Sequence, residues 1–380
     1  MKIAIVHNDY GKFSGEEAVV RDHAELFRAH DCEVVQFRRS SAELHGLSGA
    51  AKGFLSGIWN PFSRKRFAEF LEQEHPDLIH IHNLYPLVNP CILPEARKRG
   101  IPVVMTVHNF RLFCPNGLFA RGGHLCEACA ERKSVMPCLR GNCLNSRLKT
   151  LGYALRTAVT QKNGWYIDCV DRFLCLTEFQ KKKLVHYGIP DEKCRIVPNF
   201  IDSALLAKAE RAARGSAGYV AYMGRLSDEK GIDLILNAAR ELSDIPFRLA
   251  GNGAEQYRDA APPNVEFAGY LTGNAQFEFM RNARIQIMAS RCYENFPTTL
   301  LLGMALGIPA LVPDLGGMPG IIRGAGEAFS PDSMRDVIRT LWNDTSKLET
   351  YRTGAFSRIR EFSPENCWEQ LQQTYQELLS

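Results

Sequence analysis

The sequence predicts an α/β protein made of two doubly wound domains, each with a mainly parallel sheet. Short apolar runs rich in β-branched residues alternate with longer segments of helical periodicity, which is the pattern of strands joined by crossover helices. This alternation stops near residue 203 and starts again near residue 219. A chain of 380 residues has the length expected of about two such domains.

The first half contains six apolar runs short enough to be strands: 2–6, 33–37, 77–81, 103–107, 173–176 and 195–198. Between them, five segments have helical periodicity: 16–29, 64–74, 91–99, 146–162 and 178–187. Residues 203–217 are rich in Ala, Arg and Lys and are expected to form a helical linker that closes on a hinge at 214–218.

The second half repeats the pattern with five expected strands: 219–223, 247–250, 265–267, 285–288 and 310–312. Helices are expected at 232–242 and 274–282, and residues 364–379 form a long amphipathic helix. We expect an N-terminal domain of residues 1–202 plus 364–380, with a Cys-rich insertion at 111–146, and a C-terminal domain of residues 216–363. Ligands of such domains bind at the carboxyl ends of the strands, here facing a cleft between the domains.

Composition excludes several classes of protein. The formal net charge of +4 is too small to indicate a nucleic-acid partner. No apolar run approaches the roughly 18 residues of a membrane span, and the apolar start of the chain is too short for a signal peptide. We therefore expect a cytoplasmic protein, in which the 12 cysteines serve as reduced thiols or metal ligands.

The sharpest motif follows the expected strand at 219–223. Gly224 allows a ligand to approach the backbone, Arg225 offers a planar fork for phosphate oxygens, and Lys230 adds a point charge. The same segment also has the composition of an ordinary surface turn, and its spacing alone does not separate the two interpretations.

A second motif follows the strand at 285–288. Glu294 could accept hydrogen bonds from sugar hydroxyls, although a carboxylate in this place is more often a cap or a solvated group. Pro297 is suited to start a helix through 298–306, whose first N–H groups would favour an anion.

Two further motifs lie in the first half. The loop 11–17 has glycines that permit close approach to a phosphate, but it matches neither the dinucleotide fingerprint nor the P-loop. His82 and His108 lie at the ends of successive strands. One such histidine is more often structural, but two above one cleft indicate a site.

Taken in order along nearly the whole chain, these motifs resemble retaining glycosyltransferases of family 4. The segments 106–109, 197–202, 224–231, 293–297, 307–309 and 316–319 carry the resemblance. It implies a GT-B fold, in which two Rossmann-like domains enclose a cleft and the C-terminal helix crosses back to the first domain. It also implies retaining, metal-independent transfer of a sugar from a UDP- or GDP-sugar to a glycan or lipid-linked acceptor.

The resemblance assigns roles to individual residues. Arg225 and Lys230 correspond to the residues that bind the donor diphosphate, His108 to one that contacts the donor sugar, and Glu294 to one beside the sugar ring. The remaining residues of the implied donor site are Ser14, Gly15, Asn199, Gly224, Asn295, Phe296, Pro297 and Thr298.

Two positions depart from the family pattern. Leu302 stands where the family has a carboxylate that holds the nucleotide ribose, and Gly320 replaces the carboxylate of a later loop. A buried ribose hydroxyl without a partner would cost about 1–3 kcal/mol. These departures favour one alternative, a catalytically degenerate protein that serves as scaffold or partner of another transferase. A sugar-nucleotide epimerase on the same fold is a second alternative.

The insertion contains a cluster of cysteines. Cys126 and Cys129 have the spacing of a zinc knuckle, and Cys114 and Cys143 would complete a structural four-thiolate site. Cys138 or His124 could replace one ligand, and free thiols or an iron–sulfur cluster are the alternatives. Basic residues beginning at Arg147 suggest peripheral association with the inner face of an anionic membrane, although a solvated positive surface explains them as well.

Overall fold

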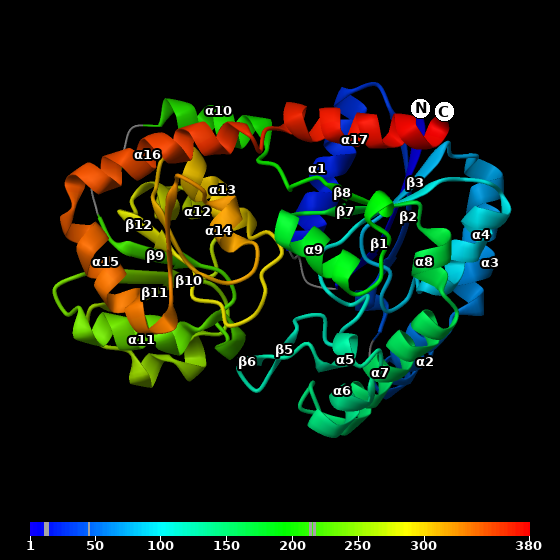
Figure 1. Ribbon diagram of the computed structural model, residues 1–380, viewed down its shortest axis with the longest axis horizontal. Coiled ribbons are helices and arrows are strands. Elements are labelled where there is room, and N and C mark those ends of the chain that lie inside the picture. Colours follow the sequence, from blue (N-terminus) through cyan, green and yellow to red (C-terminus); the bar gives the residue numbers. More distant parts are fainter. Residues whose placement is uncertain (11–14, 45, 213–214, 216–217) are drawn as a thin grey trace. The chain divides into compact units, whose positions relative to one another are not determined.

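The computed structural model describes residues 1–10, 15–44, 46–212, 215 and 218–380 (Figure 1). The chain divides into two compact units. Unit 1 comprises Met1–Gly122, Cys126–Pro198 and Cys367–Ser380, and unit 2 comprises Gly123–Leu125 and Asn199–Asn366. The expected hinge lies largely outside the described residues, and α10 (Ser203–Arg211), expected as a linker, belongs to unit 2.

Unit 1 is built on a six-stranded parallel sheet of order β2-β1-β3-β4-β7-β8. The strands are β1 (Lys2–Asp9), β2 (Glu33–Ser40), β3 (Leu78–Ile81), β4 (Val103–Thr106), β7 (Arg172–Cys175) and β8 (Cys194–Ile196). The central strands are continuous apolar runs because helices cover both faces of a parallel sheet. The strand order reverses between β1 and β3, so this is where the carboxyl ends of the strands are open to a ligand.

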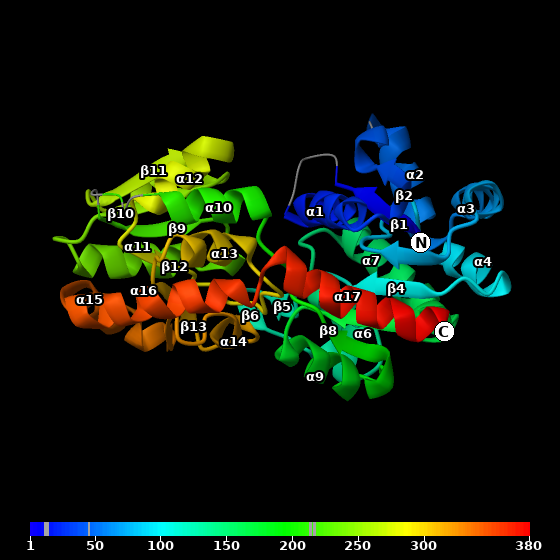
Figure 2. The ribbon, with the colours of Figure 1, turned by 90° about the horizontal axis from the view of Figure 1, so that it is seen from above.

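Seven of the described α-helices lie between or beside the strands of the unit 1 sheet along the chain. They are α1 (Gly15–Ala29), α2 (Gly46–Ile58), α3 (Pro61–Glu74), α4 (Leu93–Lys98), α7 (Arg147–Lys162), α8 (Trp165–Cys169) and α9 (Glu178–His186). In Figure 2, α1 and α2 lie at the end of the sheet formed by β1 and β2, and α9 lies at the end formed by β8. The expected helix at 91–99 begins as a 3-10 turn (Pro90–Ile92) and continues as α4.

The C-terminal helix α17 (Pro364–Leu379) has the predicted bounds, and its residues from Cys367 onward belong to unit 1. Trp368 stacks on His30, with ring centroids 4.4 Å apart, and the Tyr375 hydroxyl lies 2.8 Å from Nδ1 of His80. The predicted return of this helix to the first domain is therefore confirmed.

The Cys-rich insertion forms a two-stranded hairpin and two short helices. The hairpin joins β5 (Ala120–Arg121) to β6 (His124–Leu125), and the helices are α5 (Ala128–Glu131) and α6 (Met136–Gly141). Gly122 and Gly123 make the hairpin turn, both with positive φ, which only glycine adopts at low cost.

Unit 2 has a second six-stranded parallel sheet, of order β11-β10-β9-β12-β13-β14. Its strands are β9 (Val220–Met223), β10 (Phe247–Ala250), β11 (Val265–Gly269), β12 (Ile285–Ile287), β13 (Ala310–Pro313) and β14 (Gly326–Phe329). The first five were predicted. The fifth crossover and β14 were not, because the four residues of β14 include Gly326 and Glu327 and only Phe329 is fully buried.

The helices of unit 2 are α10, α11 (Ile232–Glu241), α12 (Gly273–Arg281), α13 (Thr298–Ala305), α14 (Met318–Ile321), α15 (Met334–Asn343) and α16 (Thr345–Arg360). They lie on both sides of the sheet, with α11 on one side and α12 and α13 on the other (Figure 1). The strand order reverses between β9 and β12, and the complete order is that of the classical dinucleotide-binding fold. The two Rossmann-like domains predicted from the sequence are thus confirmed, whereas a cleft between them stays a prediction. No described helix is long and apolar enough to cross a bilayer.

Candidate active site

In unit 2, the two strongest sequence motifs meet at the point where the strand order reverses. The segment 224–231 follows β9, and the segment 288–298 follows the neighbouring strand β12. The Arg291 amide donates a hydrogen bond of 2.9 Å to the Glu229 carbonyl. Gly231, with φ of +68°, lies so close to the Ala289 carbonyl that a Cβ at this position would overlap its oxygen. The glycine therefore allows the two loops to touch backbone to backbone.

The centre of this site is an ion pair between Lys230 and Glu294, both largely buried. The Ser290 hydroxyl donates a hydrogen bond to the same carboxylate oxygen. Burial raises the pKa of Glu294, but the Lys230 ammonium more than offsets this and holds that pKa below its ordinary value. Burial likewise lowers the pKa of Lys230, and the Glu294 carboxylate more than reverses it. Both groups are therefore charged at neutral pH.

Arg225 is placed differently. Its side chain is 62% exposed and its guanidinium donates to Glu229 at 2.6 Å, which is a surface pair of little intrinsic strength. Its backbone is firmly held, because the Arg225 carbonyl accepts a hydrogen bond of 2.9 Å from Tyr222. The fork of Arg225 is thus available to an anion without breaking a strong contact. The segment Arg225–Lys230, here called the cationic loop, carries one exposed and one buried cation.

The other residues of the predicted donor site differ in how far they are exposed to solvent. Pro297 caps α13, no side chain caps this helix, and Thr298 at its first position is exposed. Asn295 is half-buried beside Glu294. Gly224 directly follows β9, and its amide donates to the Ala250 carbonyl at 2.9 Å. An anion could reach the N-terminus of α13.

Phe296 and Asn199 face the interior of unit 2. The Phe296 ring is buried and packs edge-on against Phe362, with centroids 5.2 Å apart. A donor-binding role for Phe296 would have to use its backbone. Asn199 is buried, and its Oδ1 has no hydrogen-bond partner among the described residues. Leu302 is buried within α13, so no hydroxyl can bond to this side chain.

In unit 1, the structure brings His82 and His108 together at the ends of β3 and β4. Nδ1 of His82 lies 2.8 Å from Nε2 of His108, and the rings stack with centroids 5.1 Å apart. His82 also stacks on His80, which contacts Thr106 at 2.7 Å through its Nε2. Burial lowers the pKa of His108, although Glu16 opposes this. The histidines form a chain from the strand ends to Tyr375 of α17.

Sequence analysis missed a second set of polar residues beside His108. Glu16, near the start of α1, accepts hydrogen bonds from the Tyr10 hydroxyl at 2.7 Å and from the Asn109 amide at 3.3 Å. Arg111 donates to the same tyrosine oxygen at 2.9 Å. Burial raises the pKa of Glu16, but the charges of His108 and Arg111 outweigh it and lower that pKa. Its position directly after a glycine loop was the available signal.

Two residues of the predicted donor site, Ser14 and Gly15, belong to the glycine loop after β1. Ser14, predicted to bind the donor, lies outside the described residues. Gly15 is the first residue of α1, and a Cβ there would meet no atom within 4 Å. Donor binding at Gly15 stays a prediction.

The buried histidines predict a loss of stability in mild acid. Burial lowers the pKa of His7 and of His23 to about 4, and lowers that of His80 and His82 well below the ordinary value. Between pH 6.5 and about 4 the unfolded chain therefore binds more protons than the folded one, so stability falls as the pH falls. Each group contributes up to about 1.4 kcal/mol per pH unit.

Urea unfolding at pH 7.5, 6.0 and 5.0 measures this slope. We expect His23→Gln to reduce it and His186→Gln, at an exposed position, to leave it unchanged. Equal free energies of unfolding at pH 7.5 and 5.0 would contradict the neutral, buried state of these rings.

The five cysteines of the insertion gather in one region without forming a closed ligand set. Cys138 donates a side-chain hydrogen bond to Cys143, which lowers the pKa of Cys143 to about 7. Cys114 donates to Asn116 at 2.9 Å. Cys129 is buried, and burial raises the pKa of its thiol. The neighbouring thiols of Cys114, Cys143 and Cys126 raise that pKa further. All 12 cysteines are free, and no three of these five described sulfur atoms lie within 4.8 Å of one another.

Zinc at Cys114, Cys126, Cys129 and Cys143 stays a prediction, with Cys138 as the thiol that lies next to Cys143. We expect about one zinc per chain by elemental analysis after purification without chelators, lost in Cys129→Ser. Zinc thiolates contribute folding energy directly, so removal should also lower the midpoint of unfolding. The matched control is the buried Cys367→Ser outside the insertion, and a metal-free wild-type chain with normal stability would contradict the prediction.

Among the described residues, one other group has metal-ligand geometry: His7, Asp9 and Glu17 at the end of β1. Asp9 is already paired with Arg38 at 2.5 Å, and Glu17 accepts the Tyr10 amide at 2.7 Å. These carboxylates are engaged within the protein, and we assign no metal to them.

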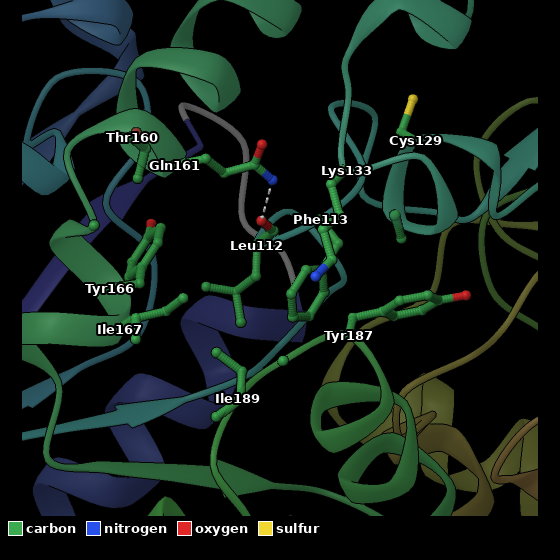
Figure 3. Close-up of a pocket in the computed structure, with 13 residues that line it drawn as sticks. Leu112, Phe113, Cys129, Lys133, Thr160, Gln161, Tyr166, Ile167, Tyr187 and Ile189 are labelled. Atoms are coloured by element: carbon green, nitrogen blue, oxygen red, sulfur yellow. Dashed lines mark hydrogen bonds between the residues drawn. The ribbon is translucent and has the colours of Figure 1, made fainter.

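A small cavity of about 280 Å³ lies in unit 1 between α8, α9 and the insertion (Figure 3). Leu112, Phe113, Ile167 and Ile189 dominate its lining, and the Gln161 amide donates to the Leu112 carbonyl at 3.0 Å. It is slightly smaller than ordinary ligand sites, and Gln161 is satisfied by the backbone. We interpret it as a packing cavity.

Comparison with known proteins agrees with this architecture. Residues 13–205 match the sequence model of Glycosyltransferase Family 4, and residues 217–344 match that of Glycosyl transferases group 1. Glycogen synthase of Streptococcus pneumoniae strain ATCC 700669 is 23% identical over 321 residues, which are 73% of this chain and 66% of that protein. The enzyme of strain CGSP14 is 24% identical over 325 residues with the same coverage. The chain thus spans just under two thirds of the length of these relatives.

Solved structures share the fold over the whole chain. Sucrose-phosphate synthase from Thermosynechococcus elongatus has a TM-score of 0.69 at 16% identity, covering 99% of this chain and 98% of that one. A glycosyltransferase from Rickettsia africae also has a TM-score of 0.69, at 13% identity and 100% and 98% coverage. Anabaena HepE, solved with UDP and glucose, has a TM-score of 0.63 at 15% identity and 99% and 100% coverage. The fold is GT-B, as predicted.

Proposed function

The chain belongs to glycosyltransferase family 4, and from this membership we propose that it transfers a hexosyl unit from a nucleoside-diphosphate sugar with retention of anomeric configuration. The acceptor is a glycan or a lipid-linked saccharide. Glycogen synthases and sucrose-phosphate synthase among the similar proteins support sugar transfer as the reaction class.

The observation that carries the proposal is the pairing of Lys230 with Glu294 where the strand order of unit 2 reverses. Transfer requires the diphosphate to leave as negative charge develops on it. Arg225 and Lys230 supply positive charge, and the N-terminus of α13 adds peptide dipoles. These groups lie on loops fixed by backbone contacts, so the charge is organised before the donor binds.

Glu294 has the complementary role. Ser290 and Lys230 hold its carboxylate ionised and oriented, which suits it to accept hydrogen bonds from sugar hydroxyls. When the diphosphate arrives, Lys230 can bind its oxygens while remaining beside Glu294. The Lys230 ammonium then contacts both the Glu294 carboxylate and the diphosphate. Because Glu294 binds the sugar, this shared contact fixes the sugar relative to the diphosphate.

The reaction needs no nucleophile from the protein. The bond between the anomeric carbon and the diphosphate oxygen breaks, and the acceptor hydroxyl oxygen bonds to the same face of that carbon. The acceptor proton passes to the departing phosphate oxygen. His108, in unit 1, would position the donor sugar, as would the backbone at Gly15.

The nucleotide is proposed to be UDP, because HepE was solved with UDP and with UDP-glucose. Thermal-shift measurements with UDP-, GDP-, ADP- and dTDP-sugars test this choice. We expect the largest rise of the unfolding midpoint with a UDP-sugar.

The variant Leu302→Glu tests the ribose end of the site. A carboxylate placed at this buried position lowers the midpoint without nucleotide, since it is desolvated. If a ribose hydroxyl hydrogen-bonds to this carboxylate, the nucleotide should raise the unfolding midpoint of Leu302→Glu by more than it raises that of wild type. An unchanged shift would place the ribose away from Leu302.

Two alternatives give different products. A scaffold protein would neither bind nor consume sugar nucleotides, and an epimerase would return a sugar nucleotide with an inverted hydroxyl. Mass spectrometry with NMR of the same reaction mixture separates transfer, epimerisation and hydrolysis.

A further inference from the structure

Unit 1 contains a second cavity, of about 1160 Å³, that none of the donor-site residues of unit 2 lines. It lies between α2 and α7, which pack side by side in Figure 1. This volume is at or above the upper end of ordinary small-molecule sites and exceeds what a single hexose needs. Most of the wall is apolar, including Leu44, Phe54, Leu118 and Leu144.

The cavity opens to solvent through exposed apolar side chains. Leu55 on α2 is 65% exposed and Leu148 on α7 is 69% exposed, and both line the cavity. Leu151 and Leu155 continue an exposed stripe along α7. Exposed basic residues border this opening: Lys52, Arg147 and Lys149.

The inner part of the cavity is cationic. Arg156 is only 5% exposed and donates one hydrogen bond, of 3.4 Å, to the Pro115 carbonyl. Its Nε has no hydrogen-bond partner, and no carboxylate forms an ion pair with it among the described residues. Its guanidinium is held over the rings of Tyr153 and Tyr85, at 3.7 Å and 4.2 Å from their centroids. Arg111 lines the same cavity, and burial together with this like charge lowers the pKa of Arg156. A buried guanidinium without a counter-ion is costly and calls for an anion.

This cationic end adjoins the site at His108. Arg111 and Tyr85 line the large cavity and also line a small one whose wall includes His82, His108 and Asn109. An anion on the two arginines would therefore lie near the histidine that the proposed function places beside the donor sugar.

We infer that the cavity between α2 and α7 binds the sugar acceptor as an amphiphile, with its hydrocarbon chain along the apolar wall and its phosphate or diphosphate group on Arg156 and Arg111. This inference rests on the proposed function and decides its acceptor in favour of a lipid-linked saccharide. Guanidinium forks match phosphate oxygens, and the exposed leucines and basic residues at the opening suit the surface from which such a lipid would enter.

Binding of farnesyl phosphate, measured by isothermal titration without any sugar nucleotide, tests the inference. We expect saturable binding, with farnesol and inorganic phosphate each at least tenfold weaker, because the site needs both halves of the molecule. Arg156→Gln should raise the Kd about 10- to 100-fold. Arg97→Gln, an exposed arginine on α4 outside the cavity lining and its opening, should leave it within about twofold.

A second variant blocks the hydrocarbon site. Gly57 is buried and lines the cavity, yet a Cβ there meets no atom within 4 Å, so its side-chain direction is open cavity space. We expect Gly57→Phe to abolish farnesyl phosphate binding and Gly57→Ala to retain it. Arg156→Gln should unfold no earlier than wild type, since an unpaired buried charge is not a source of stability.

Three results would overturn the inference: equal affinity in wild type and Arg156→Gln, inorganic phosphate binding as tightly as farnesyl phosphate, or full binding by Gly57→Phe. A cavity that instead receives a second copy of the chain would show dimers lost in Gly57→Phe and no lipid binding. Because no donor is present, failure here leaves the donor assignment intact, and failure of the nucleotide screen leaves this result intact.

Discussion

Lys230→Met should lower the turnover number by two to three orders of magnitude. Removing one preorganised group that stabilises developing negative charge typically has an effect of this size. Lys230 is the buried cation of the cationic loop, and Glu294 holds it in place. Steady-state kinetics with a sugar nucleotide and the best acceptor measures the loss.

The same substitution leaves Glu294 as an uncompensated buried carboxylate, which raises its pKa and destabilises unit 2 by about 3–5 kcal/mol. The double variant Lys230→Met/Glu294→Gln removes both charges and should recover most of this stability without recovering turnover. Lys347→Met, which breaks an ion pair with Glu327 of 2.5 Å elsewhere in unit 2, is the control and should keep normal turnover. Turnover that recovers together with stability in the double variant would show that Lys230 has only a structural role.

Gly231→Ala should lower the free energy of unfolding by about 2–5 kcal/mol. The left-handed conformation contributes about 1–2 kcal/mol and the overlap with the Ala289 carbonyl a further 1–3 kcal/mol. The loops after β9 and β12 must separate to admit the methyl group. Since Lys230 and Glu294 lie on these loops, turnover should fall about 100-fold as the charges are displaced.

Gly324→Ala is the matched control for this variant. Gly324 also lies in unit 2 and has φ of +77°, but a Cβ there meets no atom within 4 Å. It should show only the conformational penalty of about 1–2 kcal/mol and normal turnover. Urea unfolding and kinetics on both proteins measure the difference, and equal losses would mean that the contact between the loops is unimportant.

The sequence could predict every strand of the two six-stranded sheets except β14, because buried parallel strands are continuous apolar runs, which a local pattern reveals. It could not predict α2, whose 13 residues include four glycines and therefore have poor intrinsic helix propensity. That helix is stabilised by packing against α7. There, Gly152 admits the Phe54 ring, and a Cβ would lie 2.7 Å from two of the ring carbons.

Arg225 and Lys230 could be selected together from the sequence because they lie five residues apart on one loop. The network at Glu16 was not, because Asn109 and Arg111 reach it across about a hundred residues and no local spacing records that contact. The cysteines of the insertion are a similar case. The C-x-x-C spacing predicts that Cys126 and Cys129 act together, whereas in the structure Cys138 donates a hydrogen bond to Cys143.

The most direct test of the account is the product formed from the sugar nucleotide that gives the largest thermal shift. Proton NMR of the purified product shows the anomeric configuration, and the released nucleotide is quantified in the same sample. We expect one nucleoside diphosphate released per sugar transferred, a product with the donor's anomeric configuration, and loss of both signals in Lys230→Met. A product of inverted configuration, or full activity in Lys230→Met, would contradict it.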